Sequence, residues 1–313
     1  MILITGGTGF LGKRLVNKLI AAGSNVTVFA KKDDEELRQH GVNLILGDTS
    51  NQGELAMAFV NVDTVYHLAA NLDESDTKMY DENVNGTKNV VGLSKNFGAR
   101  RIIFMGSCGA LGDVRIASED APYNPRTRYE KSKAESERIV IASGIPYTII
   151  RAPVIIGPNE IWRKIFEAAK KKYPIIGSGK NHFHLAYVDD VVDMLFLVRD
   201  KEEAKNQIYH IATNDTPSYE DVYRMICTSL GAEMTTKHVS VWLIKFMSLL
   251  HTFSRKLRGK KPSLTMAKSS IDRLIRDRVI SIEKAKAIGF SPKYDTAAAI
   301  RETAEYFKSN GLL

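Results

Sequence analysis

The chain has 313 residues, of which 44% are apolar and 26% charged, as in globular proteins with one large α/β domain or two smaller ones. This composition excludes a disordered chain, a collagen and a disulfide scaffold. Cys108 and Cys227 lie far apart in the sequence, so we expect neither a zinc cluster nor a disulfide framework. We expect a cytoplasmic location. The apolar run from Ile2 ends at Gly6, and no run of about eighteen apolar residues exists, so no signal peptide or transmembrane segment is expected.

Positive charge is concentrated in one part of the chain. Residues 1–150 carry 17 Lys and Arg against 18 Asp and Glu, whereas residues 151–313 carry 27 against 18. Residues 237–278 alone hold eleven basic and two acidic side chains. Because the excess belongs to one segment, no nucleic-acid partner is expected.

In chain order, the first half alternates short apolar, β-branched runs with helical patterns such as residues 11–22. The runs are bounded by Gly, Asp or Asn, which is typical of buried strands, and they cover residues 2–5, 26–29, 42–46, 64–67, 102–105 and 148–150. This alternation predicts an α/β fold, a doubly wound Rossmann-type parallel sheet with helices on both faces. Ligands of such sheets bind at the carboxyl ends of the strands.

The pattern loosens after Arg151, where Pro and Gly become frequent. Residues 187–199 and 207–211 look like a return to the sheet, and the chain from Ser218 onward is mostly helical. We therefore expect a dinucleotide-binding domain at 1–152, with 184–212 returning to it. Residues 153–183 and 213–313 are expected to form a smaller, mostly helical substrate-binding region.

A glycine-rich loop joins the first predicted strand to the first helix. Its spacing satisfies the dinucleotide fingerprint, in which glycines allow a tight turn and a close approach of the backbone to the pyrophosphate. The helix N-terminus then offers free N–H groups to the phosphates. The predicted cofactor-binding residues here are Gly6, Gly7, Thr8, Gly9, Phe10, Leu11 and Gly12.

The end of the second strand bears on the choice of cofactor. An NAD-binding protein commonly has an acidic residue there for the ribose hydroxyls, but this chain has Ala30, followed by Lys31 and Lys32. An ammonium group could pair with the 2′-phosphate, which favours NADP over NAD. The alternative is a solvated turn in which Asp33 or Asp34 bends back to the ribose.

Tyr129 and Lys133 are four residues apart in a helical stretch and so share one helix face. A phenol that exchanges a proton with substrate near neutral pH needs its pKa lowered from about 10, and a nearby ammonium has that effect. Ser107 follows a predicted strand, where its hydroxyl could bind the same substrate oxygen. The neighbouring Cys108 is interpreted as a packing residue.

Further motifs follow in order: Asp48, His67-Leu68-Ala69-Ala70, Asn83-Val84-Asn85-Gly86-Thr87, Arg151-Ala152-Pro153 and Tyr187-Val188-Asp189-Asp190-Val191. Together with the glycine loop and the Ser107, Tyr129 and Lys133 set, they resemble the extended short-chain dehydrogenase/reductases of the NAD-dependent epimerase/dehydratase family. The resemblance covers nearly the whole chain. It implies that Ser107, Tyr129 and Lys133 are catalytic, and that Lys133 also holds the nicotinamide ribose. It further implies a cofactor cleft lined by Asp48, Thr49, Leu68, Ala69, Ala70, Asn83 and Pro153, with Asp48 at the adenine and Pro153 near the nicotinamide.

Departures from the family pattern bear on the substrate. Sugar-nucleotide epimerases usually have Val-Tyr-Gly after the catalytic serine, whereas Ala110-Leu111-Gly112 is similar to dihydroflavonol reductase-like and 3β-hydroxysteroid dehydrogenase-like members. His182-Phe183-His184 replaces an Arg-Asp pair common in the epimerases, and Gly106 replaces a serine. The two histidines are interpreted as packing or hydrogen-bonded loop residues, so no metal site is expected.

These motifs predict an NAD(P)-dependent oxidoreductase that acts on a ketone or secondary alcohol, with Tyr129 as general acid/base. The alternative is a nucleotide-sugar epimerase or dehydratase with a tightly bound cofactor. A dinucleotide-binding sensor without turnover is a third interpretation, which the intact Ser, Tyr and Lys set disfavours. The expected partner is a small-molecule substrate, and a homodimer is left open.

Residues 239–261 combine a broad apolar band with a basic end, from Arg255 to Lys261. The interpretation we favour is a helix that covers the substrate cleft, with its basic end in water. One alternative is peripheral contact with an anionic membrane that supplies an apolar substrate. Another is attraction of a diphosphate substrate.

Overall fold

The computed structural model describes the backbone of residues 1–257 and 268–313 and the side chains of residues 1–250 and 271–313. Within these ranges, seven parallel strands form one sheet: β1 Ile2–Thr5, β2 Val26–Ala30, β3 Asn43–Leu46, β4 Thr64–His67, β5 Arg101–Ser107, β7 Tyr147–Ala152 and β11 Gln207–His210. Their order is β11-β7-β5-β4-β1-β2-β3. The order in which strands are added reverses at β1, because β2 and β3 lie on one side of it and β4 and β5 on the other. The predicted Rossmann-type parallel sheet is therefore confirmed.

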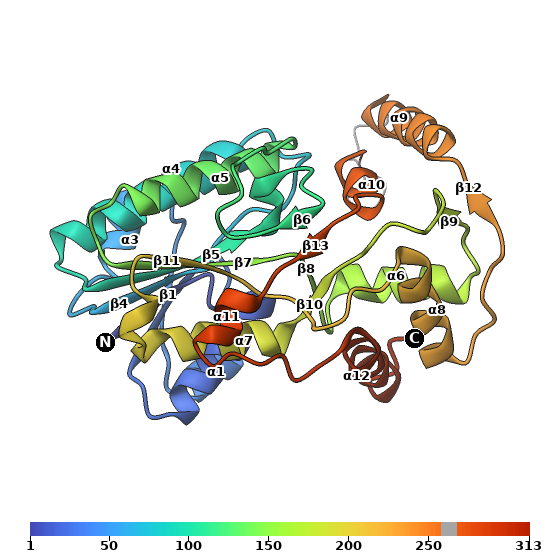
Figure 1. Ribbon diagram of the computed structural model, residues 1–313. Helices are drawn as coiled ribbons and strands as arrows, with labels where there is room; N and C mark the ends of the chain where they lie inside the picture. Colours follow the sequence, from blue (N-terminus) through green and yellow to red (C-terminus); the bar gives the residue numbers. More distant parts are fainter. Residues whose placement is uncertain (258–267) are drawn as a thin grey trace.

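Helices cover both faces of the sheet (Figure 1). On one face lie α1 Phe10–Ala21 and α7 Val188–Leu197, which pack on each other, and on the other lie α3 Gln52–Ala56, α4 Met79–Asn96 and α5 Arg128–Ile141. Successive strand residues point to opposite faces: Ile4 packs with Leu15 of α1, while Leu3 packs with Val90 of α4. Burial on both faces explains why the strands are continuous apolar runs.

One of the two segments expected to return to the sheet does so as a strand. Residues 207–210 form β11 at the edge of the sheet, next to β7. Residues 188–197 are instead helix α7, preceded by β10 Leu185–Tyr187, which pairs with β8 Val154–Ile156 outside the main sheet. The strand interpretation of residues 188–197 was wrong because an apolar run that is buried on most sides looks alike in a strand and in a helix.

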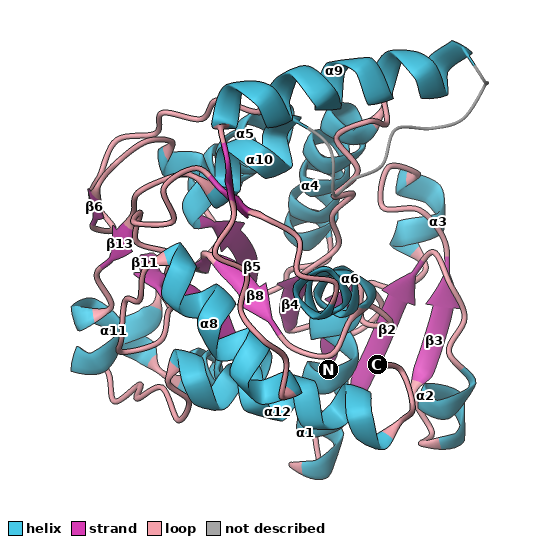
Figure 2. Ribbon diagram, turned by 90° about the vertical axis from the view of Figure 1, so that its right-hand side faces the viewer, coloured by secondary structure: helices cyan, strands magenta, loops and turns pink. Residues whose placement is uncertain are grey.

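The second half of the chain builds a helical region beside the carboxyl ends of the strands, as Figure 2 shows. Here α6 Glu160–Lys170, α8 Tyr219–Leu230 and α12 Thr296–Ser309 pack around a second apolar cluster that includes Trp162, Phe166 and Phe307. The shorter elements are α2 Glu35–Gln39, the 3₁₀ turns Cys108–Leu111, Val198–Asp200 and Glu202–Ala204, β6 Ile116–Ala117, β9 Ile175–Ile176, β12 His238–Val239, α9 Val241–Leu257, α10 Lys268–Leu274, β13 Val279–Ile280 and α11 Glu283–Ala287.

Two features of this region matter for the site. Strand β13, from the C-terminal part of the chain, pairs with β6, which follows β5. This pairing brings residues 271–280 across to the end of β5. Among the described helices, none is both long and apolar enough to cross a bilayer.

Candidate active site

The glycine loop lies between β1 and α1 at the carboxyl edge of the sheet. Gly6 has a φ of 76°, and a Cβ there would stand 2.8 Å from the backbone of Ala69. A Cβ on Gly12 would stand 2.2 Å from the Gly6 carbonyl oxygen, so side chains are excluded at both positions. Gly9 caps α1 without a side-chain hydrogen bond, which leaves N–H groups of the first helical turn for an anion. The loop therefore fits a dinucleotide pyrophosphate.

The end of β4 lies against this loop. The Leu68 N–H donates to the Thr5 carbonyl oxygen at 3.1 Å, and Ala69 and Ala70 continue past Gly6. Asn83 of α4 fixes the next residue, Asn71: its side chain accepts from the Asn71 N–H at 2.7 Å and donates to the Asn71 carbonyl at 3.0 Å. Leu68 and Ala69 thus lie beside the glycine loop, and Asn83 holds the chain just beyond them.

The end of β2 is more crowded with charge than the sequence suggested. Lys31 Nζ lies 2.7 Å from the Asp48 carboxylate and 3.1 Å from that of Glu82, so two anions already share its charge. The lysine holds the pKa of the Asp48 carboxyl below its usual range, although burial opposes this shift. Lys32 is exposed, and Thr49 packs against Gly86 of α4. Glu82 was not identified from the sequence, because its position on α4 gives no signal of contact with β2.

Asp33 and Asp34, the acidic residues of this turn, both make other contacts. Asp34 caps α2 by accepting from the Leu37 N–H and also pairs with Lys13. Asp33 pairs with Arg38. In this conformation both carboxylates are therefore engaged by basic side chains.

Tyr129 lies in the first turn of α5, whose start is fixed by a capping box. Thr127 accepts from the Glu130 N–H at 3.2 Å, and the Glu130 carboxylate accepts from the Thr127 N–H at 3.1 Å. This reciprocal pair satisfies N–H groups that a helix start leaves open, so α5 begins at Arg128. Tyr129 and Lys133 then follow one helical turn apart.

Lys133 is buried between α5 and β5. Its Nζ donates to the Met105 carbonyl at 2.7 Å and lies 4.8 Å from the centre of the Phe104 ring. Burial lowers the pKa of Lys133 to about 8, although the nearby Glu137 favours the charged form. The end of β5 therefore has beside it an amino group whose pKa lies close to neutral pH.

Ser107 ends β5 opposite Ala152 of β7, the residue before Pro153. The Ser107 hydroxyl oxygen accepts from the Gly109 N–H at 3.0 Å. Among the described residues no direct hydrogen bond joins the side chains of Ser107, Tyr129 and Lys133. The fold nevertheless brings all three, with Pro153, to the same carboxyl edge of the sheet as the glycine loop, which is where doubly wound sheets bind their ligands.

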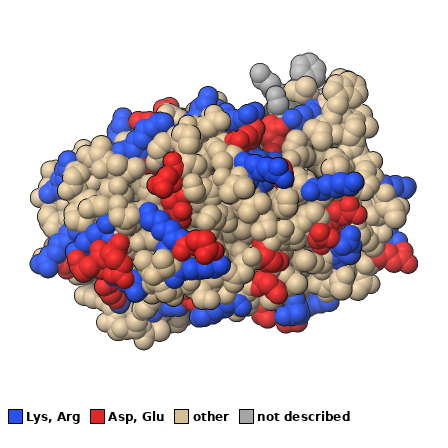
Figure 3. Space-filling view, viewed as in Figure 1, with Lys and Arg blue, Asp and Glu red and all other residues tan. Residues whose placement is uncertain are grey.

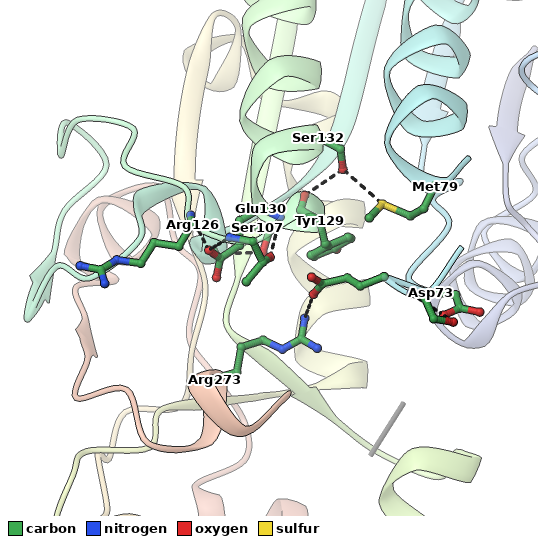
Figure 4. A network of polar contacts seen from close by, with 12 residues as sticks. Asp73, Met79, Ser107, Arg126, Tyr129, Glu130, Ser132 and Arg273 are labelled. Carbon is green, nitrogen blue, oxygen red and sulfur yellow. Dashed lines mark hydrogen bonds and ion pairs between the residues drawn. The ribbon is translucent and has the colours of Figure 1, made fainter. Parts of the chain in front are cut away.

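Tyr129 lies next to an ion pair between Arg273 and Glu74 (Figure 4), which the sequence did not reveal. Figure 4 shows its ring between Ser132 and Met79 on one side and Arg273 of α10 on the other. Arg273 pairs with Glu74, from the loop after β4, at 3.2 Å. Burial raises the pKa of Tyr129 to about 12, and the Arg273 charge counteracts part of that rise. At neutral pH the phenol in this state is protonated.

A buried ion pair between α5 and β7 supports the end of β5. Arg151 Nη2 lies 2.8 Å from the Glu137 carboxylate, and both side chains are almost wholly buried. Glu137 also accepts from the Tyr123 hydroxyl at 3.0 Å and from the Ser107 N–H at 3.3 Å. Glu137 lies one turn after Lys133 on α5, so the spacing Tyr129, Lys133, Glu137 could have suggested it.

Two arginines from the C-terminal segment complete the surroundings. Arg276 pairs with both Glu130 and Asp113, each at 2.7 Å. Arg278 donates to the Cys108 carbonyl at 2.7 Å and to the Gly112 carbonyl. No local pattern predicts these contacts, which span more than 140 residues of sequence.

The histidines of the His182-Phe183-His184 motif are hydrogen-bonded within loops. His182 Nδ1 bonds to Asp277 at 2.7 Å, and His184 bonds to the Thr213 carbonyl and the Ile280 N–H. Cys108 is fully buried, and burial raises the pKa of its thiol to about 12, so it is not a nucleophile.

The comparison with known proteins agrees with this geometry. A model of the NAD dependent epimerase/dehydratase family matches residues 2–212. The chain belongs to this family. The family prediction is thereby confirmed, and with it the prediction of an NAD(P)-dependent enzyme of the extended short-chain dehydrogenase/reductase type.

Its relatives in the family include dehydrogenases and epimerases. Human sterol-4-alpha-carboxylate 3-dehydrogenase, decarboxylating, is 31% identical over 77% of this chain and 69% of that protein. An Escherichia coli O157:H7 protein, N-acetyl-alpha-D-glucosaminyl-diphospho-ditrans,octacis-undecaprenol 4-epimerase, is 25% identical over 97% of this chain and 94% of its own length. The solved Thermus thermophilus UDP-glucose 4-epimerase complex with NAD shares the fold, with a TM-score of 0.77, 22% identity and 98% of each chain covered.

Proposed function

We propose that this family member is an NAD(P)-dependent oxidoreductase that transfers hydride between the nicotinamide and a ketone or secondary alcohol, with Tyr129 as general acid/base. The observation that carries this proposal is the convergence of Ser107, Tyr129 and Lys133 at the carboxyl edge of the sheet, beside the glycine loop. That edge is where doubly wound sheets bind their ligands.

The residues divide between holding the cofactor and moving the proton. Residues 1–152 and 184–212 would hold the dinucleotide, with the pyrophosphate on Gly6 to Gly12, the adenine near Asp48 and Thr49, and the nicotinamide near Pro153. Residues 153–183 and 213–313 would bind the substrate. When bound, the nicotinamide supplies or accepts the hydride. Ser107 would orient the substrate oxygen by a hydrogen bond from its hydroxyl.

At neutral pH, Tyr129 and Lys133 are both protonated in this state. A Tyr129 phenol with a pKa of about 12 holds its proton near neutral pH and can donate it to a forming alkoxide. Lys133, with a pKa near 8, is largely charged at pH 7 and would stabilise the phenolate that remains.

For the cofactor we propose a preference for NADP(H), carried by Lys31 and Lys32. A 2′-phosphate would compete with Asp48 and Glu82 for Lys31, so the contribution of Lys31 is smaller than that of an unpaired lysine. The exposed Lys32 would then contribute a larger share than the sequence pattern suggested.

The epimerase or dehydratase alternative has its own support. Arg273, Arg276 and Arg278 bring positive charge to the substrate side of Tyr129, where a diphosphate would be attracted. All three, however, are engaged by Glu74, Glu130, Asp113 or backbone carbonyls. We therefore rank the oxidoreductase first.

One experiment separates the two functions. The protein is incubated with NADPH or NADH and a panel of ketones, aldehydes, UDP-sugars and dTDP-sugars, while absorbance at the nicotinamide band and product identity are followed. Net oxidation of the nicotinamide with a ketone or aldehyde is expected. Sugar interconversion without net oxidation would instead establish the alternative.

A further inference from the structure

Helix α9 turns its apolar side outward, so the interpretation that this apolar band covers the substrate cleft is wrong. Six large apolar side chains are between 42% and 74% exposed: Trp242, Leu243, Phe246, Met247, Leu249 and Leu250. At 3.6 residues per turn these positions fall on one continuous side of the helix. A surface helix normally turns its apolar side inward, so this exposed face calls for an apolar partner.

The inward side of α9 is the more polar one. Lys245 pairs with Asp272 of α10, and Ser248 is 3% exposed. Val241 packs near Gly177, and Ser240 accepts from the Leu243 N–H at 3.2 Å, which fixes the start of the helix. These contacts hold the orientation of α9, so the apolar side cannot turn inward without breaking them.

The two aromatic side chains of the outward face, Trp242 and Phe246, lie at the start of the helix. The Trp242 and Phe246 rings stack with centres 5.7 Å apart and planes within 5°. Figures 1 and 2 both place α9 at the periphery of the molecule, with α10 beneath it, and Figure 3 shows an uncharged surface there. Tryptophan is well suited to the boundary between water and lipid, because its ring is both apolar and able to donate a hydrogen bond.

The surrounding charge decides between two apolar partners. Residues 237–278 hold eleven basic and two acidic side chains. Both acids, Asp272 and Asp277, are in ion pairs, but so are Lys245, Arg273 and Arg276. The excess charge therefore comes mainly from the five basic residues at positions 255–261 of the sequence. A second copy of the chain seated on α9 would bring two strongly basic segments together. An anionic bilayer instead offers negative charge and an apolar layer at once. Phe253 and the basic residues from Arg255 to Lys261 lie outside the described side chains. The basic residues contribute to this comparison only through their charge in the sequence.

We propose that α9 docks this protein on the surface of an anionic phospholipid bilayer, lying in the plane of the interface with its exposed side among the acyl chains. No described helix can span a bilayer, so the contact is peripheral. Helix α9 packs on α10, which carries Arg273 beside Tyr129. Docking would therefore bring the substrate side of the site toward the membrane; this consequence, unlike the docking itself, rests on the proposed function.

The test is flotation of the full chain with vesicles of phosphatidylcholine alone and of phosphatidylcholine with phosphatidylglycerol, at low and moderate salt. We expect binding to the anionic vesicles that weakens as salt rises, and little binding to the neutral ones. The double variant Trp242→Ser/Phe246→Ser should bind at least about tenfold more weakly, since it removes buried apolar area from the contact.

The matched control is Met57→Ser/Val60→Ser, which removes two apolar side chains of similar exposure near α3. It should float like the parent protein, and unfolding curves should show that both variants fold. Tyr129→Phe should also float normally, so a failure of the proposed chemistry would leave the docking result standing.

Three results would overturn the docking proposal. One is absence of flotation with either vesicle, and another is equal loss of binding in the control variant. The third is a dimer, seen by sedimentation without lipid, that the Trp242→Ser/Phe246→Ser change converts to monomer, because a second copy would then occupy the face.

Discussion

At the scale of single residues, burial sets the chemistry of the site. Lys133 and Tyr129 are both desolvated, and desolvation favours the neutral form of each, so the pKa of the lysine falls to about 8 and that of the phenol rises to about 12. In the mechanism that we propose, proton transfer between substrate and protein depends on the Tyr129 hydroxyl. Its removal isolates the chemical step.

Tyr129→Phe should reduce turnover by roughly two to four orders of magnitude, the range for loss of a general acid or base. Cofactor binding and the unfolding curve should stay close to those of the parent protein, because only one hydroxyl is deleted. Steady-state kinetics with the substrate found in the panel, and a nucleotide titration, measure both. Lys133→Ala should impair turnover and nucleotide binding together. Near-normal turnover in Tyr129→Phe would contradict the assignment.

The ion pairs of Lys31 lead to a prediction about nucleotide choice. Glu82→Gln removes one of the two carboxylates that hold Lys31, so NADP(H) affinity should rise roughly two- to fivefold, the scale of a partly exposed ion pair. NAD(H) affinity should change little. Fluorescence titrations with both nucleotides provide the comparison.

Lys31→Ala supplies the reverse test. It should weaken NADP(H) more than NAD(H), and Lys31→Ala/Lys32→Ala should remove the preference. Tighter binding of NADH than NADPH by the unaltered protein would show that these lysines do not read the phosphate.

At the scale of elements, one buried histidine joins four of them. His67 of β4 bonds to Thr5 of β1 at 2.7 Å and to Thr87 of α4 at 3.1 Å. Thr87 in turn donates to Ser136 of α5 at 3.0 Å. Burial, with the Lys133 charge adding to it, lowers the pKa of His67 to about 3. The imidazole is therefore an uncharged, hydrogen-bonded link between the sheet and its helices, and not a catalytic base.

This histidine should make the fold sensitive to acid. Between its ordinary pKa of 6.5 and about 3, the unfolded chain binds a proton that the native state excludes. Its contribution to stability is complete above about pH 6.5 and is lost as pH falls through that window. From pH 7 to pH 5 the loss should be about 2 kcal/mol from this residue.

The measurement is the free energy of unfolding in urea at several pH values. His67→Gln should reduce the dependence between pH 7 and pH 5, whatever it does to stability at pH 7. Part of the slope should remain, because burial also lowers the pKa of His210 to about 3. His40→Gln, which removes an imidazole at an exposed position, is the control. An unaltered slope in His67→Gln would show that another group controls acid stability.

At the scale of the whole molecule, the C-terminal segment closes the site. Residues 271–280 cross from the helical region to the end of β5, where β13 pairs with β6 and Arg276 reaches Glu130. Glu130 is 1% exposed and is also the capping residue of α5. The start of the helix that carries Tyr129 thus depends on a residue about half the chain away.

Arg276→Ala should destabilise the protein by about 3 to 5 kcal/mol, because it leaves a buried carboxylate without its cation. Turnover should fall too, as the first turn of α5 loosens. Arg115→Ala breaks a mostly exposed pair with Asp277 and should cost no more than about 1 kcal/mol. Urea denaturation of both variants tests this difference, and equal effects would contradict the special role of Arg276.

The sequence by itself determined the sheet, the glycine loop and the family. Buried parallel strands need unbroken apolar runs, and a phosphate loop excludes side chains, so both leave local patterns that can be recognised. The same holds for Tyr129 and Lys133, whose four-residue spacing is a property of one helix. Helix α7 was misplaced because its apolar run does not distinguish a buried helix from a strand.

Tertiary structure alone decided the rest. The Lys31 pair with Glu82, the Arg273 pair with Glu74 and the Arg276 pair with Glu130 join residues 51, 199 and 146 positions apart. Neither partner carries a local signal of the other. The outward apolar side of α9 is likewise invisible in the sequence, because a periodic pattern shows that a helix has an apolar side but not which way that side faces. Only the packing of α9 on α10 fixes that direction.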